Sequence, residues 1–117
     1  ATDSILDDAA LINLREVVGG DSLLFADLIL SFLDDAPRML RELREGIAEQ
    51  NAPRVHLNAH SLKGNAADFG ALRLAELCLQ LERLGKSGQL HEAKALLSQI
   101  EGEFPRVDAA LRQLLAS

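Results

Sequence analysis

The sequence lacks the features that stabilise many small secreted proteins and those that anchor proteins in membranes. It contains one cysteine in 117 residues, Cys78, so neither an internal disulfide nor a cysteine-rich zinc site can form. Its apolar runs, such as residues 28–30, are interrupted within a few residues by polar groups, far short of the roughly 20 residues that cross a bilayer. The N-terminus is acidic and has no apolar signal-peptide core. We therefore expect a cytoplasmic protein with no direct membrane contact.

Aromatic, β-branched and proline residues are also scarce. Tryptophan and tyrosine are absent, proline occurs three times, and leucine and alanine dominate a composition that is 48% hydrophobic. This mixture favours helices over sheets and argues against disorder. The length fits one domain over residues 1–117, large enough to bury a core without disulfides or metals. Within it we expect residues 1–6 to be a linker.

The sequence has fewer basic than acidic residues. The chain has 12 lysines and arginines against 18 aspartates and glutamates, a formal charge of −6. A chain with this balance repels phosphate backbones, so the sequence argues against a nucleic-acid-binding protein.

Helical spacing of apolar residues predicts five helices, and no strand-like alternation competes with it. They cover about residues 7–18, 22–47, 51–70, 71–84 and 90–114. Pro37 is expected to kink or break the second helix, Pro105 to bend the last one, and Gly85 and Gly88 to mark a turn. Short connections between amphipathic helices predict an all-α, up-and-down antiparallel four-helix bundle with an additional short N-terminal helix.

The third predicted helix carries the residues with chemical potential. His60 and Lys63 share the edge of its buried stripe, and Gly64 and Ala67 follow one and two turns after His60. Glycine within a helix costs about 1 kcal/mol relative to alanine, so its presence here suggests a clearing where a second surface approaches the histidine. A neutral imidazole offers a nucleophilic nitrogen, and a nearby lysine can hold a phosphoryl group.

This segment resembles a known family. The run H-S-L-K-G from His60, the glycine at Gly70 and the following A-L-R-L-A-E-L-C-L-Q-L-E closely resemble the histidine-containing phosphotransfer (HPt) domain of bacterial phosphorelays. The likeness extends over nearly the whole chain, including L-R-E-V-V-G-G-D near the start and E-G-E-F-P-R-V-D-A-A-L near the end.

The resemblance implies a function and roles for individual residues. His60 would carry the phosphoryl group on Nε2, Lys63 would stabilise its oxygens, and Gly64 would let a receiver domain dock. Glu82, 22 residues after the histidine, would orient the ring through its other nitrogen. The domain would relay phosphoryl groups between aspartates of response-regulator receiver domains. It would not be an enzyme in its own right, because the receiver supplies the Mg²⁺ and most of the electrostatic catalysis.

Other interpretations stay open beside this one. His56 lies one turn before His60, and we expect it to line the rim of the docking surface with Gly64 and Ala67. A histidine pair at this spacing can bind zinc or copper, but no third ligand stands out, and we expect no metal site and no bound cofactor. The alternative function is a helical docking or dimerisation module without chemistry. We expect a monomer. The chain is either a stand-alone protein or a domain of a larger hybrid sensor kinase, where it would belong to the cytoplasmic part of a membrane-bound protein; the missing initial methionine favours the second.

Overall fold

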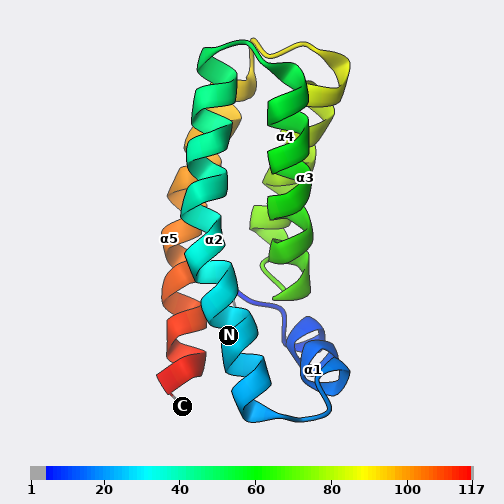
Figure 1. The fold of residues 1–117 in the computed structure, drawn as a ribbon, viewed down its shortest axis with the longest axis vertical. Helices are drawn as coiled ribbons and strands as arrows, with labels where there is room; N and C mark the ends of the chain where they lie inside the picture. The colour runs from blue at the N-terminus through cyan, green and yellow to red at the C-terminus, as the bar shows by residue number, and fades with distance from the viewer. Residues whose placement is uncertain (1–4, 117) are drawn as a thin grey trace.

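The computed structural model describes residues 5–116, and within this range the chain forms α-helices and no β-strand (Figure 1). The prediction of an all-α fold is confirmed. The helices are α1 (Asp8–Val17), α2 (Ser22–Ala48), α3 (Ala52–Asp68), α4 (Leu72–Ser87) and α5 (Ala93–Ala116).

The four longer helices pack in chain order. α2 contacts α3, α3 contacts α4, α4 contacts α5, and α5 returns to α2, while the short α1 lies at one end against α2 and α3 (Figure 1). The contact between α3 and α4 is the most extensive. In the part of the chain that the structure describes, no helix combines the length and the apolar character needed to cross a membrane.

Polar residues begin three of the helices where the sequence predicted. The side chains of Asp7, Asp21 and Asn51 accept hydrogen bonds from backbone N–H groups in the first turns of α1, α2 and α3. Such caps satisfy donors that have no partner within the helix. α4 ends at Gly88, whose φ of 78° is the left-handed conformation that glycine adopts without strain.

The core runs the length of the bundle and is built almost entirely from aliphatic side chains. Three phenylalanines join helices α2 and α5 and the end of α3: the Phe32 ring lies 5.2 Å from Phe69 and 6.1 Å from Phe104, between centroids. On α3, every third or fourth residue is buried: Val55, Ala59, Leu62 and Ala66. This stripe fixes which face of α3 points to solvent.

Of the two outcomes predicted at Pro37, a kink or a break of α2, the break is wrong. α2 continues from Ser22 to Ala48 through this proline, and α5 likewise continues through Pro105. Proline inside a helix removes one hydrogen bond and costs about 3 kcal/mol. Pro37 itself is exposed, and the buried residues on either side, Ala36 and Met39, hold both halves of α2 on the same core.

Two predicted boundaries around the α4–α5 connection also need correction. Gly85 does not begin a turn: it is a buried residue within α4, which continues to Ser87. The last helix begins at Ala93, not at residue 90, although Leu90 is buried in the connection as the apolar pattern required. Packing therefore overrides the low helix propensity of Gly85, because a residue without a side chain suits a close helix contact.

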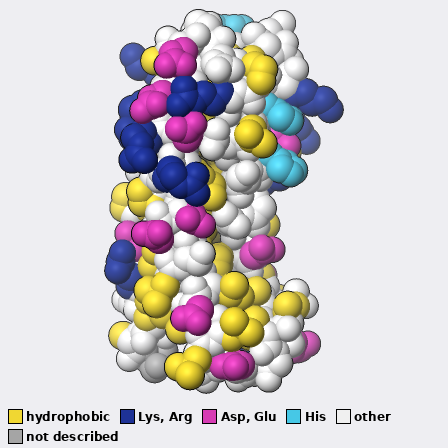
Figure 2. Space-filling view, viewed as in Figure 1, with side chains coloured by type: hydrophobic (Ala, Val, Ile, Leu, Met, Phe, Trp, Pro, Cys, Tyr) yellow, Lys and Arg dark blue, Asp and Glu magenta, His cyan; other side chains and the backbone are white. Residues whose placement is uncertain are grey.

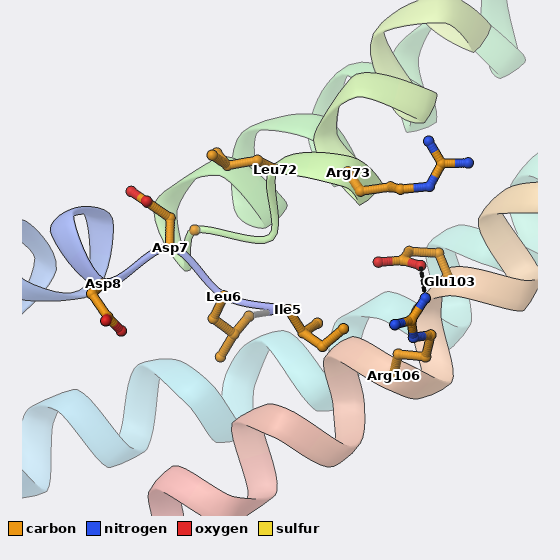
Figure 3. Close-up of a pocket in the computed structure, with 9 residues that line it drawn as sticks. Ile5, Leu6, Asp7, Asp8, Leu72, Arg73, Glu103 and Arg106 are labelled. Carbon is orange, nitrogen blue, oxygen red and sulfur yellow. Dashed lines mark ion pairs between the residues drawn. The ribbon is translucent and has the colours of Figure 1, made fainter. Parts of the chain in front are cut away.

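Residues 5 and 6 belong to the domain and not to a linker, which corrects the sequence prediction; residues 1–4 lie outside the described part. Leu6 is buried in the core, and the Asp7 N–H donates to the Gly70 carbonyl at 2.8 Å. Figure 3 shows this segment beside a pocket of about 470 Å³, which lies between residues 5–8, the start of α4, and α5. There the nearly buried Glu103 forms an ion pair with Arg106 at 3.5 Å.

One arginine ties the end of α2 to the start of α3. Arg54 forms ion pairs of 2.8 to 2.9 Å with Glu42, Glu45 and Glu49. Its guanidinium, through its hydrogen bond, lowers the pKa of Glu42. The cluster closes the α2–α3 turn at the surface.

Gly102 offers a test of how α5 is stabilised. It lies inside α5. A Cβ added there would meet no heavy atom within 4 Å, apart from its chain neighbours and the nearby backbone of its own helix. Gly102→Ala should therefore raise the free energy of unfolding by about 1 kcal/mol, because alanine loses less backbone entropy. Urea denaturation followed by circular dichroism measures this; a lower midpoint in the variant would contradict it.

Candidate functional site

The packing of α3 determines which of its side chains reach solvent. Because Ala59 and Leu62 are buried in the core, His60 and Lys63 lie on the adjoining surface, towards α4. The His60 side chain is 62% exposed and the Lys63 side chain 29%. Figure 2 shows histidine side chains at the surface, in the half of the molecule away from α1. The exposed imidazole expected from the sequence is therefore present.

A carboxylate from α4 joins these two residues. The Glu82 Oε2 atom lies 2.8 Å from the His60 Nδ1 atom, and its Oε1 atom lies 2.6 Å from the Lys63 ammonium nitrogen. The Glu82 side chain is only 13% exposed. The structure thus brings together three residues that the sequence singled out from two different helices.

The charge on Glu82 determines which His60 nitrogen carries the proton. The ammonium of Lys63 is the main cause that lowers the pKa of Glu82, with a further contribution from His60, while burial opposes both. An ionised carboxylate can only accept hydrogen bonds, so His60 Nδ1 must be the N–H donor. In the neutral ring, Nε2 then keeps its lone pair and faces away from Glu82.

In this structure the Lys63 ammonium forms an ion pair with Glu82. The Glu82 Oε1 atom is enclosed and has no partner in full hydrogen-bond geometry, so the ammonium at 2.6 Å compensates its charge. Burying a charge without such a partner is costly. Lys63 therefore stabilises the residue that holds His60; contact with phosphoryl oxygens, the role implied by the resemblance, stays a prediction.

Because Gly64 and Ala67 have little or no side chain, nothing bulky projects from the surface beside His60. Both are exposed, and a Cβ at Gly64 would meet nothing within 4 Å. A shallow, mainly apolar groove of about 410 Å³ continues from them to α4, where Leu72, Ala75 and Leu79 line it. On the other side of His60, Leu57 is 63% exposed. A protein surface could reach the imidazole here without displacing a bulky side chain.

His56 lies beside the site and is half-buried, while its expected place at the rim of the docking surface stays a prediction. Its ring stacks on that of His60 with 6.4 Å between centroids and 20° between planes. Its Nδ1 atom lies 3.3 Å from the Glu82 carbonyl oxygen, which can only accept, so this nitrogen also carries a proton. Among residues 5–116, no group of three or more histidine, cysteine, aspartate or glutamate side chains is arranged to hold a metal.

Sequence reasoning missed the role of Gly85. A Cβ at this position would lie 2.6 Å from the backbone nitrogen of His56, closer than real Cβ contacts. The signal was present, because Gly85 continues the buried spacing of Leu81 along α4, but glycine was taken as a turn residue. The pocket in Figure 3 has no part in the site: neither His60, Lys63 nor Glu82 lines it.

The site of this helical domain is the exposed His60 imidazole, held through Nδ1 by the largely buried carboxylate of Glu82. The Hpt domain family model matches residues 27–116, and the chain belongs to this family. Its fold is similar to that of histidine-containing phosphotransfer protein B (HptB) from Pseudomonas aeruginosa PAO1, with 33% sequence identity and a TM-score of 0.85 over 96% of this chain and 95% of that one.

A second solved structure shows the same fold across a greater distance. The histidine-containing phosphotransfer protein ZmHP2 from maize is 23% identical, with a TM-score of 0.81 over 97% of this chain and 88% of that one. Among curated proteins, no sequence matches significantly.

The ion pair between Lys63 and Glu82 predicts a measurable titration. Because the folded-state pKa of Glu82 lies below its unfolded value, its charge stabilises the fold above the ordinary carboxyl pKa, and this contribution is lost as the pH falls through the lowered pKa. Lys63→Met should raise the pKa of Glu82, since burial then acts with less opposition. Carbon-13 NMR of the Glu82 carboxyl group measures it.

The exposed Lys94 on α5 provides the matched control, because Lys94→Met removes the same charge away from Glu82. An unchanged Glu82 titration in Lys63→Met, or an equal rise in both variants, would mean that the ion pair does not set this pKa.

Proposed function

We propose that this domain is a phosphorelay intermediate that accepts a phosphoryl group on His60 Nε2 from a receiver-domain aspartate and passes it to another receiver's aspartate. Membership of the Hpt family and the likeness to a bacterial phosphotransfer protein support the relay role. The observation that carries the assignment to His60 is its hydrogen bond to Glu82, which leaves the exposed Nε2 free as the nucleophile. The four longer helices, as an up-and-down antiparallel bundle, are its rigid support.

The forward transfer follows from the protonation state of the ring. The Nε2 lone pair attacks the phosphorus of an aspartyl phosphate, a P–N bond forms, and the P–O bond to the aspartate breaks with its electron pair returning to the carboxylate. The Nδ1 proton stays in place, so the phosphorylated ring carries positive charge. The Glu82 carboxylate at 2.8 Å from Nδ1 stabilises this charge as it develops. The reverse steps deliver the group to the next aspartate.

Lys63 would contact the phosphoryl group once it has been transferred. Once the ring of His60 becomes positive, Glu82 has a second cationic partner, and the Lys63 ammonium can turn from Glu82 towards the phosphoryl oxygens. Its flexible stem and its 29% exposure suit this movement. Lys63 would therefore hold Glu82 ionised before the transfer and contact the phosphoryl group after it.

The remaining parts of the reaction belong to the partner. A receiver domain would bring the phosphorylated aspartate and the Mg²⁺ that neutralises the transferred group, so this domain needs no cofactor and no kinase activity of its own. Gly64 and Ala67, with the groove towards α4, form the low surface on which the receiver would dock as a partner of a monomer.

The central test is phosphoryl transfer from a phosphorylated receiver with Mg²⁺. His60→Gln should abolish uptake of label, because it removes the nucleophilic nitrogen, while His91→Gln, a change of the same kind at an exposed histidine before α5, should leave it intact. The label on the parent protein should be labile in acid and stable in alkali, as a phosphoramidate is. Autoradiography after gel electrophoresis at short times measures both.

Two outcomes would overturn the proposal. Uptake of label by His60→Gln equal to that of the parent protein would remove His60 as the acceptor. No uptake by the parent protein from any receiver, with receiver binding retained, would favour a docking module without chemistry.

The clearing at Gly64 predicts a separate effect on docking. Gly64→Gln should weaken receiver binding and slow the transfer at least about tenfold, because the new side chain occupies the approach to His60. Gly102→Gln is the matched control, since both glycines lie within helices and have open space beside them. Isothermal titration calorimetry and the transfer assay measure the two effects; equal behaviour of both variants would refute the docking role of Gly64.

A further inference from the structure

Helices α3 and α4 approach each other closely where Gly85 faces His56. A Cβ built on Gly85 would lie 2.6 Å from the backbone nitrogen of His56 and 2.8 Å from its Cα. These are main-chain atoms, which cannot move aside as the end of a flexible side chain can. Any side chain at Gly85 would therefore separate the two helices locally, since the distance between helix axes depends on the residues at the contact.

A hydrogen bond lies at the same contact. The His56 ring donates its Nδ1 proton to the carbonyl oxygen of Glu82 at 3.3 Å. Gly85 and the Glu82 carbonyl thus contact one residue of α3, the first by close approach of the backbones and the second through the imidazole. Both contacts lie at the level of His56, where they add to the apolar packing that places α4 along α3.

The acceptor histidine lies one helical turn further along α3. The same Glu82 that accepts from His56 through its backbone reaches His60 through its carboxylate, at 2.8 Å from Nδ1. This hydrogen bond is sensitive to displacement, because N–H···O bonds in proteins usually lie at about 2.7 to 3.2 Å and weaken steeply away from linearity. A shift of α4 of about 1 Å would therefore release His60 from Glu82.

We propose that His56 and Gly85 are positioning residues that hold the Glu82 carboxylate against His60 and so set its tautomer and its reactivity towards phosphoryl donors. The proposal deepens the phosphotransfer function and rests on His60 as the acceptor. It differs from the docking role expected for His56, because a docking residue affects only reactions with a receiver protein.

The first experiment compares two glycines that pack between helices. Gly85→Ala should displace α4, whereas Gly46→Ala, at the contact of α2 with α3, meets mainly the Val55 Cγ2 atom at 3.2 Å and touches no residue of the site. Nitrogen-15 NMR of the His60 ring reads the tautomer in the unphosphorylated protein. We expect the Nδ1–H form to become partly mixed with the Nε2–H form in Gly85→Ala and to remain dominant in Gly46→Ala.

The rate of His60 phosphorylation by phosphoramidate provides a second measurement without any receiver. In that reaction Nε2 attacks the phosphorus, the P–N bond of the donor breaks, and ammonia leaves. We expect a rate about tenfold lower in Gly85→Ala than in Gly46→Ala, compared at equal folded fraction, because misplacement of about 1 Å at a reacting group has effects of this order or larger.

A pair of substitutions at His56 tests the hydrogen bond without changing the helix contact. His56→Leu fills similar space but has no donor, whereas His56→Asn places an amide N–H near the position of the Nδ1 proton. The leucine variant should show the altered His60 tautomer and the slower phosphoramidate reaction, and the asparagine variant should restore both. If Gly85→Ala fails to fold, the two His56 variants alone test whether this contact positions Glu82 against His60.

The outcomes separate this inference from the function on which it rests. A His60 tautomer and phosphoramidate rate unchanged in His56→Leu and in folded Gly85→Ala would overturn the inference. Loss only of the receiver reaction in His56→Leu would overturn it too and assign His56 to docking. A parent protein that reacts with phosphoramidate at His60 but with no receiver would refute the relay function and leave the positioning roles measurable.

Discussion

The site depends on the two contacts that the Glu82 carboxylate makes with α3. The carboxylate reaches across from α4 to two residues of α3, accepting from His60 through Oε2 and facing the Lys63 ammonium through Oε1. A carboxylate largely removed from water is stabilised by such partners, and in return it fixes the proton of His60 on Nδ1. The bundle therefore holds two helices close enough that one acidic side chain contacts both an imidazole and a cation.

This requirement explains where the bundle is packed most closely. The contact between α3 and α4 is the most extensive in the fold, and small residues permit it: Gly85 meets the backbone of His56, and Ala59 and Ala66 lie on the buried stripe of α3. The solvent-facing surface of α3 beside this contact shows the reverse arrangement, with Gly64 and Ala67 exposed along the groove towards α4. Small residues thus have two effects on one helix pair: they allow close internal packing, and they leave open the surface on which the proposed receiver would dock.

Much of this was predictable from the sequence, because helix caps and apolar spacing act locally. Asp7, Asp21 and Asn51 began helices where expected, and the spacing from Val55 to Ala66 predicted the buried face of α3. The errors at Pro37 and Gly85 have one cause: their local preference opposes a helix, and only tertiary packing, which a single sequence does not display, overrides it. The pairing of Lys63 with Glu82 likewise depends on the register of two helices.

The geometry also bears on why a carboxylate suits this position. A neutral amide could accept from Nδ1, but it would not compensate the positive charge that the ring would gain in the proposed transfer, in which Nε2 bonds to phosphorus. A carboxylate does so, although it would repel the incoming phosphoryl group if it were near it. Here Glu82 lies on the Nδ1 side of the ring, is largely buried, and has the Lys63 ammonium beside its other oxygen. Its negative charge is thereby directed at the imidazole and shielded from the side where a phosphoryl donor would approach.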